Sequence, residues 1–306
     1  MPAPVMTVCG PVAADELGVT LIHEHLFADT LREYRSDGLL SDLDLAVREL
    51  VGFKAAGGGT VVDVTPATLG RAPELLKRAS ELAEVHIVMG CGHYRDPYIA
   101  DTTLDRESVA TAARALVAEI RDGVGSTGIR PGIIGEVGSD RAWVSALEER
   151  ALRAAGVAQV STGLAITLHA ARWQVGRDLV GILDDVGVAA DRIVVGHLDT
   201  VPDTDYHREL AEHGCWLEFD GFASDVPHET DRQLHGIRRL FDAGHADRVL
   251  VSHDLFRLSH FSAYGGVGLT HLLTSVREQA LSSGFTVDEL DQLLWSNPGR
   301  VLAGAA

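Results

Sequence analysis

Short apolar runs rich in β-branched residues recur along the chain, and each is bounded by glycine, proline or aspartate. Most are followed by a longer stretch in which apolar residues recur every three or four positions. Strands that alternate with helices in this way are typical of repeated βα units. The pattern predicts eight strands, at residues 18–25, 59–65, 85–92, 131–138, 164–170, 192–199, 215–221 and 248–254.

The amphipathic stretches between these runs are long enough to form right-handed crossover helices. They include residues 42–56, 105–121, 142–159, 173–186 and 229–243, and after a loop at 255–268 two further helices are predicted at 269–282 and 287–294. Eight strand-helix pairs predict an α/β fold, a (β/α)8 TIM barrel, and no shift in composition divides residues 1–306 into more than a single domain. An open, doubly wound sheet is the structural alternative.

Five of the eight predicted strands carry a candidate metal ligand, histidine or an acidic residue, at or near the carboxyl end. These residues are His23 and His25 in the first strand, Glu136 in the fourth, His169 in the fifth, His197 in the sixth and Asp254 in the eighth. The carboxyl ends of all strands of a (β/α)8 barrel meet on one face, where active sites are built. Residues far apart in the sequence are therefore expected to meet there.

Side chains two residues apart on a strand point to the same side, so His23 and His25 are expected to face the barrel axis. Glu24 between them then points away, toward a neighbouring loop or helix. Four imidazoles and two carboxylates suit Zn²⁺, Mn²⁺ or Co²⁺. Six ligands exceed one tetrahedral site, and two ions about 3.5–4 Å apart that share a carboxylate and a hydroxide would use all six.

Any one of the fourteen histidines is by itself more often a surface or hydrogen-bonded core residue. The prediction rests on their joint occurrence at the strand ends.

Net charge and composition exclude some classes of binding partner. A formal charge of −18 argues against nucleic acid or an anionic membrane as partner, and no signal peptide or run of eighteen apolar residues is present. A cytoplasmic protein that acts on a small molecule is expected. Three widely spaced cysteines, Cys9, Cys91 and Cys215, are expected to be reduced.

The ordered motifs "TVCGPV", "GVTLIHEHLF", "GIIGEVG", "TLHA", "VVGHLD", "LVSHD" and "WSNPGRVLA" resemble the phosphotriesterase-like branch of the amidohydrolase superfamily nearly end to end. The resemblance implies a (β/α)8 barrel with a binuclear centre, usually of zinc. It assigns His23, His25 and Asp254 to the more buried ion, and His169 and His197 to the more exposed one. Relatives are commonly dimers, and Phe53, Phe222 and Phe261 could contribute to such an interface or pack inside.

Many members of the family bridge the metals with a carboxylated lysine on the fourth strand. This chain has only Lys54 and Lys77, both in predicted helices. Glu136 matches the bridging position instead, as in the subgroup called phosphotriesterase homology or phosphotriesterase-related proteins. Glutamate has the single negative charge of a carbamate on a shorter arm.

These matches imply that a metal-bridging hydroxide attacks an ester, lactone or phosphoester bond while Asp254 accepts a proton. At the position of Asp199 the family often has a partner for proton removal or histidine orientation, and a loop cap is the structural alternative. Loops after the strands bring Tyr94, Arg95, Arg172, Arg257, His260 and Tyr264 near the expected substrate. Arginines in an acidic chain indicate an anionic group on that substrate, although each could instead form a salt bridge.

Three other functions are compatible with the same residues. An N-acyl amide hydrolase would use the same mechanism, and a mononuclear deaminase or cyclic amidase would not need Glu136. A non-catalytic, metal-containing binding protein is the third alternative.

Overall fold

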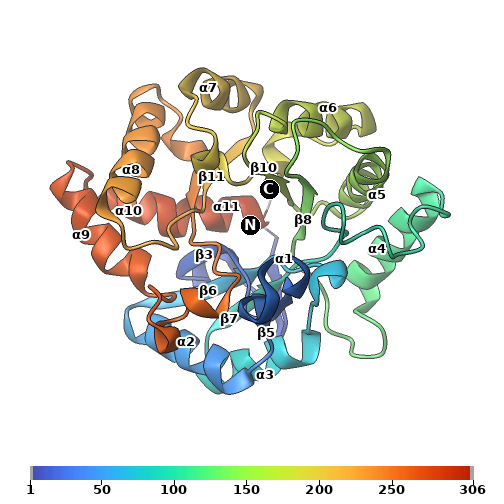
Figure 1. Ribbon diagram of the computed structural model, residues 1–306, viewed down its shortest axis with the longest axis horizontal. Coiled ribbons are helices and arrows are strands. Elements are labelled where there is room, and N and C mark those ends of the chain that lie inside the picture. Colours follow the sequence, from blue (N-terminus) through green and yellow to red (C-terminus); the bar gives the residue numbers. More distant parts are fainter. Residues whose placement is uncertain (1–2, 304–306) are drawn as a thin grey trace.

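The computed structural model describes residues 3–303 and confirms the (β/α)8 fold. Figure 1 shows a ring of helices around a central group of strands. The barrel strands are β3 (Val19–Glu24), β6 (Gly58–Asp63), β7 (His86–Met89), β8 (Ile134–Ser139), β9 (Ile166–Ala170), β10 (Ile193–Val195), β11 (Trp216–Phe219) and β12 (Val249–Val251). Each predicted strand is present, and the observed strands are shorter.

The barrel consists of two parallel sheets, β3-β6-β7 and β8-β9-β10-β11-β12. Backbone hydrogen bonds join them at both seams. Between β7 and β8 the amide of Gly132 donates to the carbonyl of Met89 at 2.9 Å, and the amide of Gly135 donates to the carbonyl of Cys91 at 2.5 Å. Between β12 and β3 the amide of Asp254 donates to the carbonyl of His23 at 3.2 Å, which closes the ring.

The outer ring consists of α2 (Leu43–Ala55), α3 (Pro73–Ala83), α4 (Val109–Asp122), α5 (Ala146–Thr162), α6 (Gly176–Val186), α7 (Thr204–His213), α8 (Pro227–Asp242) and α9 (Ser275–Ser282). The short elements are β1 (Val5–Thr7), β2 (Gly10–Val12), β4 (Ala28–Asp29), β5 (Leu39–Leu40), α1 (Leu31–Tyr34), α10 (Val287–Asp291) and α11 (Asn297–Ala303). No helix within residues 3–303 is long and apolar enough to cross a membrane.

Several predicted helix starts were wrong by three or more residues, and polar caps explain two of them. The hydroxyl of Ser108 accepts from the amide of Thr111 and starts α4, and Ser145 with Glu148 forms a capping box that starts α5. The helix predicted at 269–282 begins only at Ser275, and the one at 287–294 becomes a π-helix at Gln292–Ser296.

The core has two layers, as expected for a barrel with alternating strands. Ile22, Val62, Val88 and Leu250 pack together inside the barrel, closed at its amino-terminal end by residues of α11. The alternate strand residues pack against the helices. Phe53, Phe222 and Phe261 are almost fully buried, so they pack inside the protein.

Candidate metal centre

Four of the six predicted ligands lie around one point at the ends of β3, β8 and β12. His25 Nε2 lies 3.3 Å from Asp254 Oδ1 and 3.5 Å from Glu136 Oε1. His23 Nε2 lies 3.7 Å from Glu136 Oε2 and 3.8 Å from Asp254 Oδ1. The three side chains of His23, His25 and Glu136 are essentially buried and could hold one cation.

The other two histidines approach the same glutamate from β9 and from the end of β10. His169 Nδ1 lies 2.8 Å and His197 Nε2 lies 3.2 Å from Glu136 Oε2. The two imidazole nitrogens are 2.7 Å apart. Glu136 therefore belongs to two groups of potential ligands, one on each side of its carboxylate.

Local geometry explains why β8 and β9 can bring their residues so close. Gly138 has a φ of 157°, and a Cβ at this position would collide with the backbone of His169. On β3 the pairing with β6 shifts register between Leu21 and Glu24. Such irregularities re-aim side chains, and here His23 points to the centre although Ile22 packs inside the barrel too.

An unpaired polar atom fits a site for cations. Among residues 3–303, His23 Nε2, which faces Glu136 and Asp254, is buried without a hydrogen-bond partner. A buried imidazole nitrogen without a partner is costly unless a ligand or an ion satisfies it. Together with a carboxylate between two sets of histidines, this nitrogen has the chemistry that Zn²⁺ or Mn²⁺ requires.

Three residues behind the histidines fix their orientation, and the sequence analysis did not identify them. His23 Nδ1 lies 2.9 Å from Glu218 Oε2, and His197 Nδ1 lies 2.9 Å from Asp220 Oδ1. His25 Nδ1 lies 2.8 Å from the hydroxyl of Thr65. Such partners commonly set the tautomer and raise the basicity of metal-binding histidines. Alternating acidic residues in "CWLEFDG" were the available sequence signal.

The electrostatic field of this cluster favours cations. Burial lowers the pKa of His23, but Glu218, Asp220 and Glu136 outweigh burial and raise it to about 10. Burial raises the pKa of Asp220, but His197 and His23 outweigh it and lower that pKa to about 2. The buried carboxylates around the histidines are therefore stabilised by a nearby positive charge, which a bound cation would supply.

Glu24 is a buried residue that ties the first strand to the end of the last. Its Oε1 accepts hydrogen bonds from Ser252 Oγ, from the amide of His253 and from His253 Nδ1, and its Oε2 accepts from the amide of Leu255. Glu24 points away from the cluster, as expected. It holds the residues on both sides of Asp254, which has the left-handed φ of 57°.

Asp199 lies outside the cavity that the cluster opens into. Its Oδ1 accepts from the amide of Asp220 at 3.3 Å, and Asp220 in turn contacts both Nδ1 and the amide of His197. Burial and Asp220 raise the pKa of Asp199 to about 7. Its nearest connection to the cluster is thus through Asp220.

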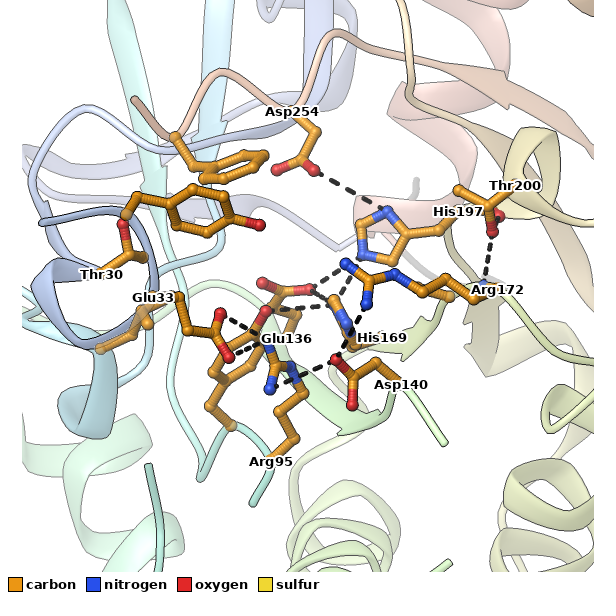
Figure 2. A pocket seen from close by; sticks show the side chains of 15 residues that line it. Thr30, Glu33, Arg95, Glu136, Asp140, His169, Arg172, His197, Thr200 and Asp254 are labelled. Atoms are coloured by element: carbon orange, nitrogen blue, oxygen red, sulfur yellow. Dashed lines mark hydrogen bonds and ion pairs between the residues drawn. The ribbon is translucent and has the colours of Figure 1, made fainter. Parts of the chain in front are cut away.

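A cavity of about 180 Å³ lies above the cluster (Figure 2). Of the predicted substrate residues, Tyr94, Arg95 and Arg172 line it. Arg257, His260 and Tyr264 do not line it. Arg257 Nε instead donates to His260 Nε2, and the side chain of Tyr264 is 60% exposed on the surface. The remaining wall residues, which the sequence analysis did not identify, are Thr30, Glu33, Tyr34, Leu69, Asp140, Ala171, Thr200 and Phe256.

The two arginines of the cavity differ in their freedom to bind a ligand. Arg95 is buried and makes two hydrogen bonds to Glu33, at 2.8 and 3.0 Å, and an ion pair with Asp140 at 3.4 Å. Arg172 is 65% exposed in its side chain, and its only carboxylate neighbour within residues 3–303 is Asp140, at 3.9 Å. Figure 2 shows Arg172 extending from beside Thr200 toward the middle of the cavity. Arg172 therefore has donors to offer an anion.

The structure places both lysines on outer helices, Lys54 on α2 and Lys77 on α3. Lys54 forms an ion pair with Glu84. Neither position is on β8, so no lysine lies next to Glu136.

The chain is similar to known proteins over nearly its whole length. The phosphotriesterase family model matches residues 3–302. The N-acetyltaurine hydrolase of Homo sapiens is 31% identical over 97% of this chain and 97% of its own length. The crystal structure of the phosphotriesterase homology protein of Escherichia coli, with phosphate in its active site, has a TM-score of 0.89 and 28% identity, covering 94% of this chain and 99% of that one.

A resiniferatoxin-binding protein from Rhodobacter sphaeroides has a TM-score of 0.90 and 31% identity, covering 98% of this chain and 95% of that one.

Proposed function

This chain belongs to the phosphotriesterase family and is a metal-dependent hydrolase, and we propose that it uses two divalent ions to cleave an acyl bond in a small anionic substrate. Zinc is the first candidate for these ions because imidazole and carboxylate ligands suit it, and Mn²⁺ or Co²⁺ would fit the same atoms. The position of Glu136 carries the proposal. Its carboxylate lies between His25 on one side and His169 and His197 on the other.

The ligand assignment proposed for the two ions follows the two groups around that carboxylate. His23, His25 and Asp254 would hold one ion, His169 and His197 the other, and Glu136 both. When bound, the ions would activate a water and polarise the carbonyl or phosphoryl oxygen of the substrate.

Asp254 is the proposed proton acceptor. Its carboxylate lines the cavity, is 20% exposed and lies next to His25 and His197, so it can reach both the attacking water and the leaving group. Asp199 is not in reach of the cavity. The geometry favours the second role considered for it, orientation of His197, which it would perform through Asp220.

The bond type is inferred from the relatives and the arginine. Cleavage of an ester, lactone or phosphoester was the first expectation from the sequence, with an N-acyl amide as the alternative. The human relative is named for hydrolysis of N-acetyltaurine, an amide with an anionic sulfonate. Since Arg172 offers a free guanidinium at the cavity mouth, we place an N-acyl amide with a sulfonate or carboxylate first.

A phosphoester or lactone is the second candidate. The phosphate in the active site of the Escherichia coli relative supports it, because that site accommodates a tetrahedral anion.

Activity profiling of the metal-reconstituted protein tests the proposal. The panel contains N-acetyltaurine, N-acetyl amino acids, anionic lactones, phosphomonoesters and a neutral N-alkylacetamide. The expected result is hydrolysis of an anionic N-acyl amide, with two metal ions per chain. Full activity with one ion per chain would instead indicate a mononuclear enzyme, and no turnover of any compound would indicate a binding protein.

The role of Arg172 is tested with Arg172→Ala. Loss of one charge-assisted contact predicts that KM for the anionic substrate rises about tenfold while KM for the neutral amide is unchanged. Arg114→Ala, which removes an exposed arginine on α4, is the matched control. Equal effects of Arg172→Ala on both substrates would contradict the proposed contact.

A further inference from the structure

A second cavity, of about 210 Å³, lies between α7 and α8 and shares no lining residue with the catalytic cavity. Its walls come from the residues after β10, from α7, from β11 and from one face of α8. They are Leu198, Asp199, Pro202, Thr204, His207, Phe219, Arg232, Gln233, His235, Gly236 and Arg239. It is comparable in size to the catalytic cavity, and both apolar and polar side chains line it.

The rim of this second cavity is positively charged. Arg232, His235 and Arg239 are exposed and lie on one face of α8, because they are spaced by three and four residues. Within the described part of the chain, neither arginine forms an ion pair, whereas Arg238 on the same helix pairs with Glu289. Their guanidinium groups therefore keep donors for a ligand. The rim can bind an anionic group.

The interior offers hydrogen-bond acceptors. Gln233 is 4% exposed, and its Nε2 donates to the carbonyl of Gly221 at 2.9 Å, which leaves Oε1 buried without a partner. Asp199 lies beside it, since a Cβ added to Gly221 would meet both Asp199 Oδ2 and Gln233 Nε2. The ring of His207 is already engaged, because its Nε2 lies 2.7 Å from the carbonyl of Val201.

We propose that this second cavity binds a small zwitterion, with its ammonium group directed to Asp199 and Gln233 and its carboxylate or sulfonate directed to Arg232 and Arg239. The order of charges, acceptors inside and cations at the rim, matches an amino acid or an aminosulfonate. The choice of ligand rests on the proposed function, because hydrolysis of an anionic N-acyl amide releases a zwitterion of this kind.

A bound zwitterion would have a direct route to the catalytic site. Asp199 accepts from the amide of Asp220, whose carboxylate contacts Nδ1 and the amide of His197. An ammonium group on Asp199 would therefore act on the residue that orients His197. The second cavity would sense the amino product of the reaction.

Calorimetric titration of the metal-loaded full chain with taurine and with glycine tests the binding. We expect one of them to bind outside the catalytic cavity, with affinity reduced about tenfold or more in the double variant Arg232→Ala/Arg239→Ala and unchanged in Arg172→Ala. Ethanesulfonate and ethylamine, each with one of the two charges, should bind more weakly than taurine by about tenfold.

Three results would overturn the proposal. They are absence of binding by both zwitterions, loss of binding in Arg172→Ala with retention in the double variant, and equal affinity for ethanesulfonate and taurine. Both arginines of the double variant are exposed, so the variant is expected to fold, which circular dichroism checks.

The titration needs no turnover, so its outcome is separate from that of the substrate panel. Binding of a zwitterion without hydrolysis of any amide would refute the proposed function and support the second binding site. Amide hydrolysis without binding of a zwitterion at the second cavity would support the proposed function and refute the second binding site.

Discussion

At the scale of single residues, Glu136 is the carboxylate on which the proposed centre depends. It is 2% exposed, and His169, His197 and His23 outweigh the effect of burial and lower its pKa well below the usual range. A carboxylate held in this charged form between histidines acts as a fixed negative charge for two cations. Within residues 3–303, Glu136 is the acidic residue that has both His25 and His169 as neighbours, at 3.5 and 2.8 Å.

We therefore predict that Glu136→Gln abolishes loading of both ions and lowers kcat by about a thousandfold or more, because the amide keeps the shape and removes the charge. Metal analysis by mass spectrometry and kinetics of the reconstituted variant measure this. Bicarbonate should not change wild-type activity, since no lysine lies at the bridge. A requirement for bicarbonate would refute the assignment.

Glu24 is the second residue with a role of its own, which is to position Asp254 without binding metal. Because it holds the amides on both sides of Asp254, we predict that Glu24→Gln lowers kcat about tenfold or more, with KM and metal content nearly unchanged. Glu49→Gln is the matched control. Glu49 is also a buried carboxylate, and it holds the same loop farther along, at Ser262 and Leu269. Equal losses of kcat in both variants would indicate a structural role only.

At the scale of elements, α8 and α10 are held together by a pair of hydrogen bonds. Arg238 donates to both carboxylate oxygens of Glu289, at 2.8 and 3.0 Å, and Glu289 also closes the capping box with Thr286. The hydrogen bond from Arg238 lowers the pKa of Glu289 to about 2. A carboxyl whose pKa is lowered on folding stabilises the protein above its unfolded pKa, about 4.3, and loses this effect as the pH falls toward 2.

We predict that Glu289→Gln lowers the free energy of unfolding by about 0.5–1 kcal/mol at pH 7 and that this difference shrinks near pH 3. Urea unfolding of the wild type and the variant at both pH values measures it. Asp288→Asn on the same helix is the control, with a smaller effect at pH 7. A difference that grows at low pH would contradict the assignment.

At the scale of the whole molecule, the proposed ions would connect the two sheets of the barrel. His23 lies in β3 and His25 directly after it, so both belong to the β3-β6-β7 sheet. The other four proposed ligands come from the second sheet: Glu136 and His169 lie in its strands, and His197 and Asp254 lie just after its strands. The seam between β12 and β3 has few backbone hydrogen bonds. Because the ligands come from both sides of that seam, bound metal ions would hold the two sheets together and increase the stability of the folded protein.

Removal of the metal is therefore predicted to lower Tm by about 5 °C or more, because a site saturated at about a hundred times its Kd contributes about 2.7 kcal/mol. Thermal unfolding with and without a chelator measures the shift, and added Zn²⁺ or Mn²⁺ should restore it. Glu136→Gln should show little response to the chelator. A chelator shift of the same size in this variant would place the stabilising ion elsewhere.

The sequence by itself determined the barrel and the six residues that meet above it. In a parallel barrel all strands end on one face, so histidines and acids at five strand ends are brought together whatever the helices between them contain. Alternation along the first strand predicted His23 and His25 inward and Glu24 outward. The structure has these directions, and the register shift of β3 is what lets His23 face the centre next to the inward Ile22.

Only the tertiary structure decided which charged residues remain free and which are paired. Arg95 and Arg172 look alike in the sequence, yet Glu33 and Asp140 engage the first and leave the second largely exposed. Asp199 lies two residues after His197 in the sequence, but in the structure Asp220 lies between the Asp199 carboxylate and the His197 ring. The physical reason is that pairing and burial depend on side chains from distant segments, and hydrophobic periodicity specifies where a strand lies without specifying which polar partners will face its end.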